Sequence, residues 1–102
     1  MNNPAYQTQD TVEARARIRV IYDHGLAMRV SHSIVKIVQH APASFRFQFE
    51  ERIADGDSML ELLALAAPCG SIIEATAAGA DANEAMPHFL SQLPRDYFEV
   101  VE

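Results

Sequence analysis

The stretch DHGLAMRVSHS, residues 23–33, contains the side chains best suited to phosphate chemistry. A histidine ring nitrogen can carry a phosphoryl group covalently, and the stretch includes His24 and His32. Arg29 could hold phosphate oxygens through charge-assisted hydrogen bonds. The stretch also has the pattern of a loop that opens a helix, whose first N–H groups attract anions. Its centre, Ala27 and Met28, can accept no phosphoryl group, so the pattern indicates a phosphate site without a central nucleophile.

Ser58 is a second candidate for phosphate chemistry. It stands where a helix should begin, and Glu61 three residues later completes a capping-box pattern. A phosphate on Ser58 would lie at a helix start, where negative charge is favoured. Ser58 could equally be only the helix cap, and Asp57 and Glu61 would repel a phosphate dianion. Both interpretations stay open at this point.

The other reactive side chains show no pattern typical of catalysis or metal binding. No two of the four histidines stand at metal-ligand spacing with a supporting carboxylate, so we expect neither a metal nor a cofactor. Cys69 is the only cysteine, which excludes an internal disulfide and a cysteine zinc cluster. We expect it to be an inert or mildly exposed thiol.

Composition narrows the class of protein. The 102 residues suffice for one domain, and 49% hydrophobic residues predict an ordered core. The net charge of -6 argues against binding to nucleic acid or to anionic membranes, which both depend on clustered Lys and Arg. The first residues lack a signal-peptide pattern and no apolar run could span a bilayer, so we expect a cytoplasmic protein. A protein or a small ligand is the expected partner.

Hydrophobic periodicity predicts the elements that position these residues. Residues 12–22 alternate as a strand whose solvent-exposed face carries Arg15, Arg17 and Arg19. These arginines either remain hydrated on the sheet surface or pair with acidic residues on neighbouring strands. Residues 28–40 have helical spacing that ends before Pro42. Alternating phenylalanines predict a strand from residue 44, and a shorter strand follows over residues 50–55.

The second half continues with a short helix from Ser58 and a strand over residues 71–77. Asp81 and Glu84 repeat the capping pattern before a helix that reaches Leu93, and Pro87 inside it predicts a kink or a late start. Residues 95–102 could pair as an edge strand or stay loose. Four strands that are each apolar on one face predict an α+β open-faced sandwich, a four-stranded antiparallel sheet with three helices on one face.

Three motifs in this order resemble a known family. They are GLxxR at 25–29, DGDSMLELLALAAPCG at 55–70 and AAGADANEAMPHFL at 77–90. Together they are similar to HPr, the histidine-containing phosphocarrier of the bacterial sugar phosphotransferase system, over about residues 13–93. The resemblance implies the same fold. It divides the chain into a flexible tail, 1–11, an HPr-like domain, 12–94, and a C-terminal extension, 95–102.

The resemblance also implies what the loop should do. In the family the loop reads Gly-Leu-His-x-Arg-Pro, and its histidine accepts phosphate from a phosphoenolpyruvate-dependent enzyme and passes it to sugar transporters. Here Ala27 stands at the histidine position and Val30 at the proline position. Arg29 matches the family arginine, which implies that it could still bind phosphate oxygens. The resemblance therefore implies a non-transferring regulatory or adaptor relative that is not itself a catalyst. Ser58 matches the family serine that a dedicated kinase phosphorylates.

Two alternatives remain open. The protein could still transfer phosphate through His32 or His24, or it could keep the fold only as an interaction module for an unrelated partner.

A partner-binding surface is expected between the starts of the first two helices. Met28, Met59 and Leu63 would form an apolar centre, with a basic rim of Arg29, His32 and Lys36. Met59 and Leu63 could instead be ordinary core residues of an amphipathic helix. The implied partners are a phosphotransferase-system enzyme, a kinase or a regulator, with no nucleic acid and no membrane.

Overall fold

A computed structural model describes residues 12–101 of the chain, and the predicted tail 1–11 lies outside this range. The elements, in chain order, are β1 (Glu13–Val20), α2 (Met28–Val38), β2 (Ser44–Phe49), β3 (Arg52–Asp55), α3 (Met59–Ala64), β4 (Ile72–Ala78), α4 (Ala82–Gln92) and β5 (Phe98–Val101). All seven predicted elements are present.

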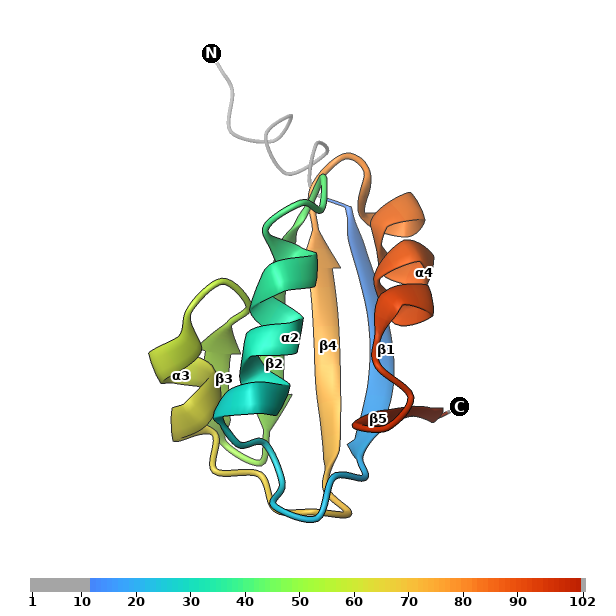
Figure 1. Cartoon of the computed structure of the whole chain (residues 1–102). Coiled ribbons are helices and arrows are strands. Elements are labelled where there is room, and N and C mark those ends of the chain that lie inside the picture. The colour runs from blue at the N-terminus through green and yellow to red at the C-terminus, as the bar shows by residue number, and fades with distance from the viewer. Residues whose placement is uncertain (1–11, 102) are drawn as a thin grey trace.

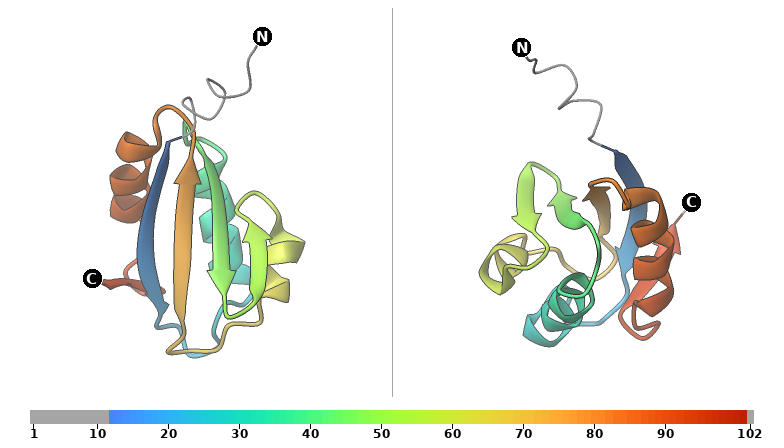
Figure 2. Two further views of the ribbon diagram at one scale, coloured as in Figure 1. Left: turned by 180° about the vertical axis from the view of Figure 1, so that it is seen from behind. Right: turned by 90° about the horizontal axis from the view of Figure 1, so that it is seen from above.

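The strands form one antiparallel sheet in the order β3-β2-β4-β1-β5. The three helices lie on one face of this sheet, and the opposite face is open (Figures 1 and 2). The predicted open-faced α+β fold is therefore confirmed.

The predicted strand count of four is wrong by one, because the segment after Pro94 pairs with β1. Phe98 lies opposite Val20 in the register, and both side chains are buried. On the open face Glu99 accepts a hydrogen bond from Arg19 Nε at 3.2 Å. Burial of an aromatic ring stabilises the strand far more than an exposed ion pair can, so Phe98 is the main reason that β5 forms.

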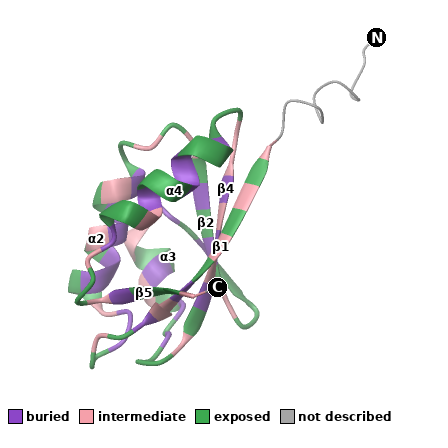
Figure 3. Cartoon of the chain, turned by 90° about the vertical axis from the view of Figure 1, so that its right-hand side faces the viewer, coloured by how far each residue is buried: buried purple, intermediate pink, exposed green. Residues whose placement is uncertain are grey.

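The core lies between the sheet and the helices, and it follows the predicted alternation. Phe45 and Phe47 of β2 contact Phe89 of α4 with ring centroids 4.7 and 5.7 Å apart. Figure 3 shows buried and exposed residues alternating along the strands. Ile18 of β1 and Ile73 of β4 continue the buried face of the sheet. This packing fixes α2 and α4 on the sheet through large apolar contacts.

Two predictions about α4, its late start at Pro87 and its side-chain cap at Asp81, differ from the structure. The helix begins at Ala82 and passes through Pro87 without interruption, so the late start is wrong. Pro87 is exposed, and the buried residues Ala85, Met86 and Phe89 hold the helix on the sheet. Asp81 is the N-cap residue, but its side chain makes no cap hydrogen bond because its backbone, at φ -102 and ψ 20, is not in the extended conformation of a side-chain cap.

Candidate functional site

The loop before α2 is held tightly against the loop that follows α3. Leu26 is buried, and its N–H donates to the carbonyl of Ala67 at 2.9 Å. Gly25 has φ +70, and a Cβ at this position would lie 2.5 Å from the same Ala67 oxygen. Only glycine fits such a close backbone approach in a left-handed conformation. The GL pair of the motif thus fixes where α2 begins.

Ala27 lies at the N-cap of α2, and its carbonyl accepts the first helical hydrogen bond from Ser31 N–H at 2.8 Å. The helix has no side-chain cap and no acidic residue in its first turn. The first N–H groups of a helix have no partners within the helix, so this end carries uncompensated positive charge. The methyl group of Ala27 offers no atom that could bond to a phosphoryl group.

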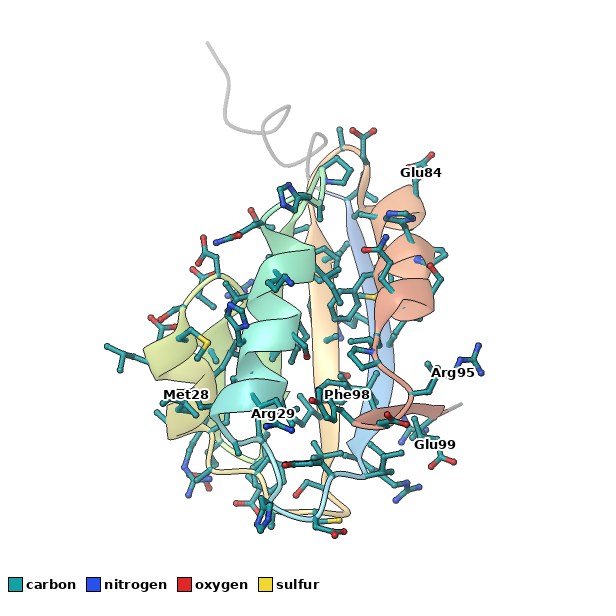
Figure 4. All side chains as sticks on the ribbon, in the orientation of Figure 1. Met28, Arg29, Glu84, Arg95, Phe98 and Glu99 are labelled. Carbon is teal, nitrogen blue, oxygen red and sulfur yellow. The ribbon has the colours of Figure 1, made fainter. Side chains whose placement is uncertain are left out.

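An exposed stripe of α2 continues from this end. At about 100° per residue, Met28, Arg29, His32 and Lys36 fall within about 100° of one another around the helix. All four are exposed. Figure 4 shows Met28 on the side of the helix toward α3 and Arg29 on the side toward β5. The structure thus brings together the four predicted site residues that α2 contributes.

Arg29 has no ion-pair partner among residues 12–101. Since α2 contains no acidic residue, its exposed stripe is basic on a protein whose net charge is -6. An unpaired guanidinium beside free helix N–H groups can hold an oxyanion through charge-assisted hydrogen bonds.

His24 lies in a turn before α2, closed by a hydrogen bond from Gly25 N–H to the carbonyl of Tyr22 at 2.9 Å. Its exposed ring meets the Tyr22 ring edge-on at 5.5 Å, and Tyr22 meets Tyr97 in the same way at 5.2 Å. The sequence patterns did not predict these ring contacts of Tyr22 and Tyr97, because Tyr97 comes close to the loop only when β5 pairs with β1.

Ser58 caps α3 as predicted, since its Oγ accepts a hydrogen bond from Glu61 N–H at 3.2 Å. The second hydrogen bond of the predicted capping box, from Ser58 N–H to the Glu61 side chain, is replaced by another. The Glu61 carboxylate accepts from Asp55 N–H at 2.7 Å, so it ties the helix to the end of β3. Ser58 is half-buried as a residue, and its exposed hydroxyl oxygen already accepts the hydrogen bond from Glu61 N–H.

Helix α3 runs antiparallel to α2, so its C-terminal end, and not its start, lies beside the start of α2 (Figure 1). Met59 and Leu63 are half-buried and packed between core and surface. Leu60 is 80% exposed and Met28 is 66% exposed. The sequence did not single out Leu60, because the run MLELLALAA is apolar at most positions and has no clear period.

No group of three or more His, Cys, Asp and Glu side chains within residues 12–101 could hold a metal ion. Cys69 is exposed and free. In the same part of the chain no helix combines the length and apolar character that a bilayer crossing requires.

The sequence matches the family model described as the PTS HPr component phosphorylation site over residues 14–93. The chain belongs to the HPr family. No curated protein matches the sequence closely enough to serve as a relative.

Solved structures of HPr proteins have the same fold. The phosphocarrier protein HPr from Bacillus anthracis str. Ames shares 24% identity with a TM-score of 0.66, over 82% of this chain and 98% of that one. HPr-C-His from Thermoanaerobacter tengcongensis shares 16% identity with a TM-score of 0.70, over 78% and 90% of the two chains. The histidine-containing phosphocarrier protein of Mycoplasma shares 20% identity with a TM-score of 0.71, over the same 78% and 90%.

Family membership makes the chain an HPr-like component of the phosphotransferase system, and HPr proteins work with other proteins of that system. An HPr protein carries phosphate and is not a catalyst by itself. The family match ends at residue 93, so β5 lies outside it.

Proposed function

We propose that this HPr-like protein does not transfer phosphate and acts as a regulatory or adaptor relative within a phosphotransferase system in the cytoplasm. The observation that carries the proposal is Ala27 at the N-cap of α2, between the GL pair and Arg29. In the HPr motif this is the place of the histidine, and alanine cannot form the phosphoryl bond.

The remainder of the site supports binding without transfer. Arg29 and the open N–H groups of α2 keep an electropositive cradle, and the exposed Met28 adds apolar surface beside it. Leu60 adds exposed apolar surface further away, at the start of α3. An apolar centre with a basic rim suits docking of a protein with acidic surface residues. The docking surface proposed here comprises Met28, His32, Lys36, Met59 and Leu63, with Leu60 added from its exposure.

Ser58 is the proposed regulatory phosphorylation site. Its hydroxyl oxygen is exposed and caps α3, so a phosphate added to it would stand at the cap position beside Glu61 N–H. The new dianion would lie close to Asp57 and Glu61, and the repulsion would loosen the start of α3. Phosphorylation would thereby alter the side of the docking surface that α3 contributes.

A second candidate is transfer through His24 or His32. His24 is favoured by its exposure in the loop before α2 and by its contact with Tyr22. His32 lies five residues beyond Ala27, which places it about 7.5 Å further along the helix axis, away from the N–H groups that would stabilise a phosphohistidine. The His32 ring therefore has a poorer electrostatic setting than a side chain at residue 27 would have.

The proposal is tested by intact mass after incubation with ATP and an HPr kinase. We expect an acid-stable gain of one phosphate in the wild type and no gain in Ser58→Ala. Ser71→Ala serves as the matched control and should be phosphorylated normally. A wild type that stays unmodified, or a Ser58→Ala variant that is still modified, would remove Ser58 from the proposal.

A further inference from the structure

The open face of the sheet, on the side away from the helices, carries four of the eight basic residues of the chain. Arg15, Arg17 and Arg19 lie on β1, and Arg46 lies on β2. None of the helices α2, α3 and α4 covers this face, which is seen directly in the left view of Figure 2. The strand register sorts these arginines into rows that run across the sheet.

Two of the rows contain a carboxylate beside the arginine. Arg19 pairs with Glu99 of β5 at 3.2 Å. Arg17 lies opposite Glu74 of β4 in the register. Opposite charges on neighbouring strands balance each other in these rows, as expected for a solvated sheet face.

The remaining row is different, because Thr76 of β4 lies between Arg15 and Arg46. Neighbouring strands lie about 4.8 Å apart, so the two arginine backbones are roughly 10 Å apart with the threonine between them. Two guanidinium groups on either side of a hydroxyl can converge on one oxyanion. The same row continues to Asp55 on β3, opposite Arg46.

Two of the three polar side chains of this row make no hydrogen bond or ion pair with residues 12–101, and the third makes only an exposed one. Within residues 12–101, Arg46 has no ion pair, even with Asp55, and the Thr76 hydroxyl has no hydrogen bond. Arg15 meets Glu13 at 3.4 Å, but both side chains are exposed, and such a pair contributes little. A hollow of about 230 Å³ lies over the row and extends to Ile53, which is 57% exposed.

We propose that Arg15, Thr76 and Arg46 form a binding site for the oxyanion group of a small organic acid or phosphate ester. The anion competes with Glu13 for Arg15 through an exposed pair that contributes little, and with Asp55, which makes no ion pair with Arg46. The apolar part of the ligand lies on Ile53, and Glu74 at the border of the hollow excludes ligands with a second anionic group on that side.

The test is a titration of the full chain, at low ionic strength, with inorganic phosphate and separately with butyrate, followed by amide and arginine side-chain NMR signals. We expect saturable shifts at Thr76 and Arg46 with at least one of the two anions. Saturation by phosphate only would indicate a phosphate ester, and saturation by butyrate only would indicate a carboxylate. Shifts of the Met28 and Arg29 signals would show that the anion also binds at the start of α2, and they are counted separately from binding to the arginine row.

Three variants locate the site. Arg46→Gln should weaken binding at least tenfold, and Thr76→Val should weaken it by a smaller factor. Arg19→Gln removes an arginine from a balanced row and should leave the affinity unchanged. Each variant is first checked for an unchanged melting temperature. The proposal is overturned if neither anion saturates the Thr76 and Arg46 signals, or if Arg46→Gln and Arg19→Gln weaken binding equally.

Discussion

Helix α3 begins at Ser58 with its own cap, whereas α2 begins at Ala27 with none. At α3 a serine oxygen accepts the Glu61 N–H, and the Glu61 carboxylate lies in the first turn near the positive end of the helix. At the start of α2 no side chain accepts a hydrogen bond from the first N–H groups, and the first turn contains no acidic residue. The start of α3 is therefore satisfied by the protein itself, and the start of α2 remains available to an outside anion or partner.

The two starts also differ in how they are fixed. The backbone contact between Gly25 and Ala67 fixes the start of α2, while side-chain hydrogen bonds fix the start of α3. Because backbone contacts of the preceding loop fix the position of α2, the first N–H groups of this helix stay free for binding. Substitutions at the two helix starts should therefore change stability through different contacts.

Gly25→Ala should have the largest effect. The added Cβ would meet the Ala67 oxygen at 2.5 Å, and alanine is strained at φ +70. We expect a loss of about 2–4 kcal/mol in the free energy of unfolding, measured by urea denaturation. Gly70→Ala is the matched control, since its φ of +95 is also left-handed but no atom lies within 4 Å of the added Cβ. Equal losses in the two variants would show that the contact with Ala67 does not fix α2.

Ser58→Ala should reduce the free energy of unfolding by about 1 kcal/mol, because the Glu61 N–H loses its acceptor. Ser58→Asp should restore most of this loss, since a carboxylate also caps a helix. Urea denaturation of both variants measures the difference. A Ser58→Ala variant as stable as the wild type would contradict the contrast between the helix starts.

Ala27→Ser should raise stability by about 0.5–1 kcal/mol, because the backbone of Ala27 is already extended, at φ -82 and ψ -179, and suits a side-chain cap. Thermal unfolding measures the gain. The same change at Ala66, which has a φ of 54 and lies outside the helix starts, gives the control and should bring no comparable gain. An unchanged melting temperature in Ala27→Ser would indicate that the α2 N–H groups are already satisfied.

Arg29→Gln should change the free energy of unfolding by less than about 0.5 kcal/mol, since this exposed side chain has no ion pair within residues 12–101. It should weaken binding to the general enzyme of the phosphotransferase system by about tenfold or more, because a charge-assisted contact is lost. Calorimetric titration measures the affinity, with Arg95→Gln as an exposed control. Equal affinities for Arg29→Gln and wild type would place the docking surface elsewhere.

The fold was largely predictable because each strand has one apolar face, and the phenylalanines of β2 alternate clearly. The exceptions depend on tertiary contacts. The segment FEVV is too short to predict its own partner, and it becomes β5 because Phe98 finds buried space opposite Val20. Pro87 lies on the exposed side of α4, which sequence spacing alone did not reveal.

The candidate site was predictable where one helix presents it. Met28, Arg29, His32 and Lys36 share a stripe that follows directly from helical spacing. The contribution of α3 was less predictable, because the direction of this helix relative to α2 depends on the whole β2-β3 hairpin. The same limit applies to the row Arg15, Thr76 and Arg46, which comes from three strands distant in sequence.

The most direct test of the central claim is intact mass after incubation with phosphoenolpyruvate and the general enzyme of the phosphotransferase system. The wild type should gain no phosphate, whereas Ala27→His should gain one acid-labile phosphate, because it returns a nucleophile to the open end of α2. An acid-labile phosphate on the wild type that disappears in His24→Ala or His32→Ala would contradict the account and make the protein an active carrier.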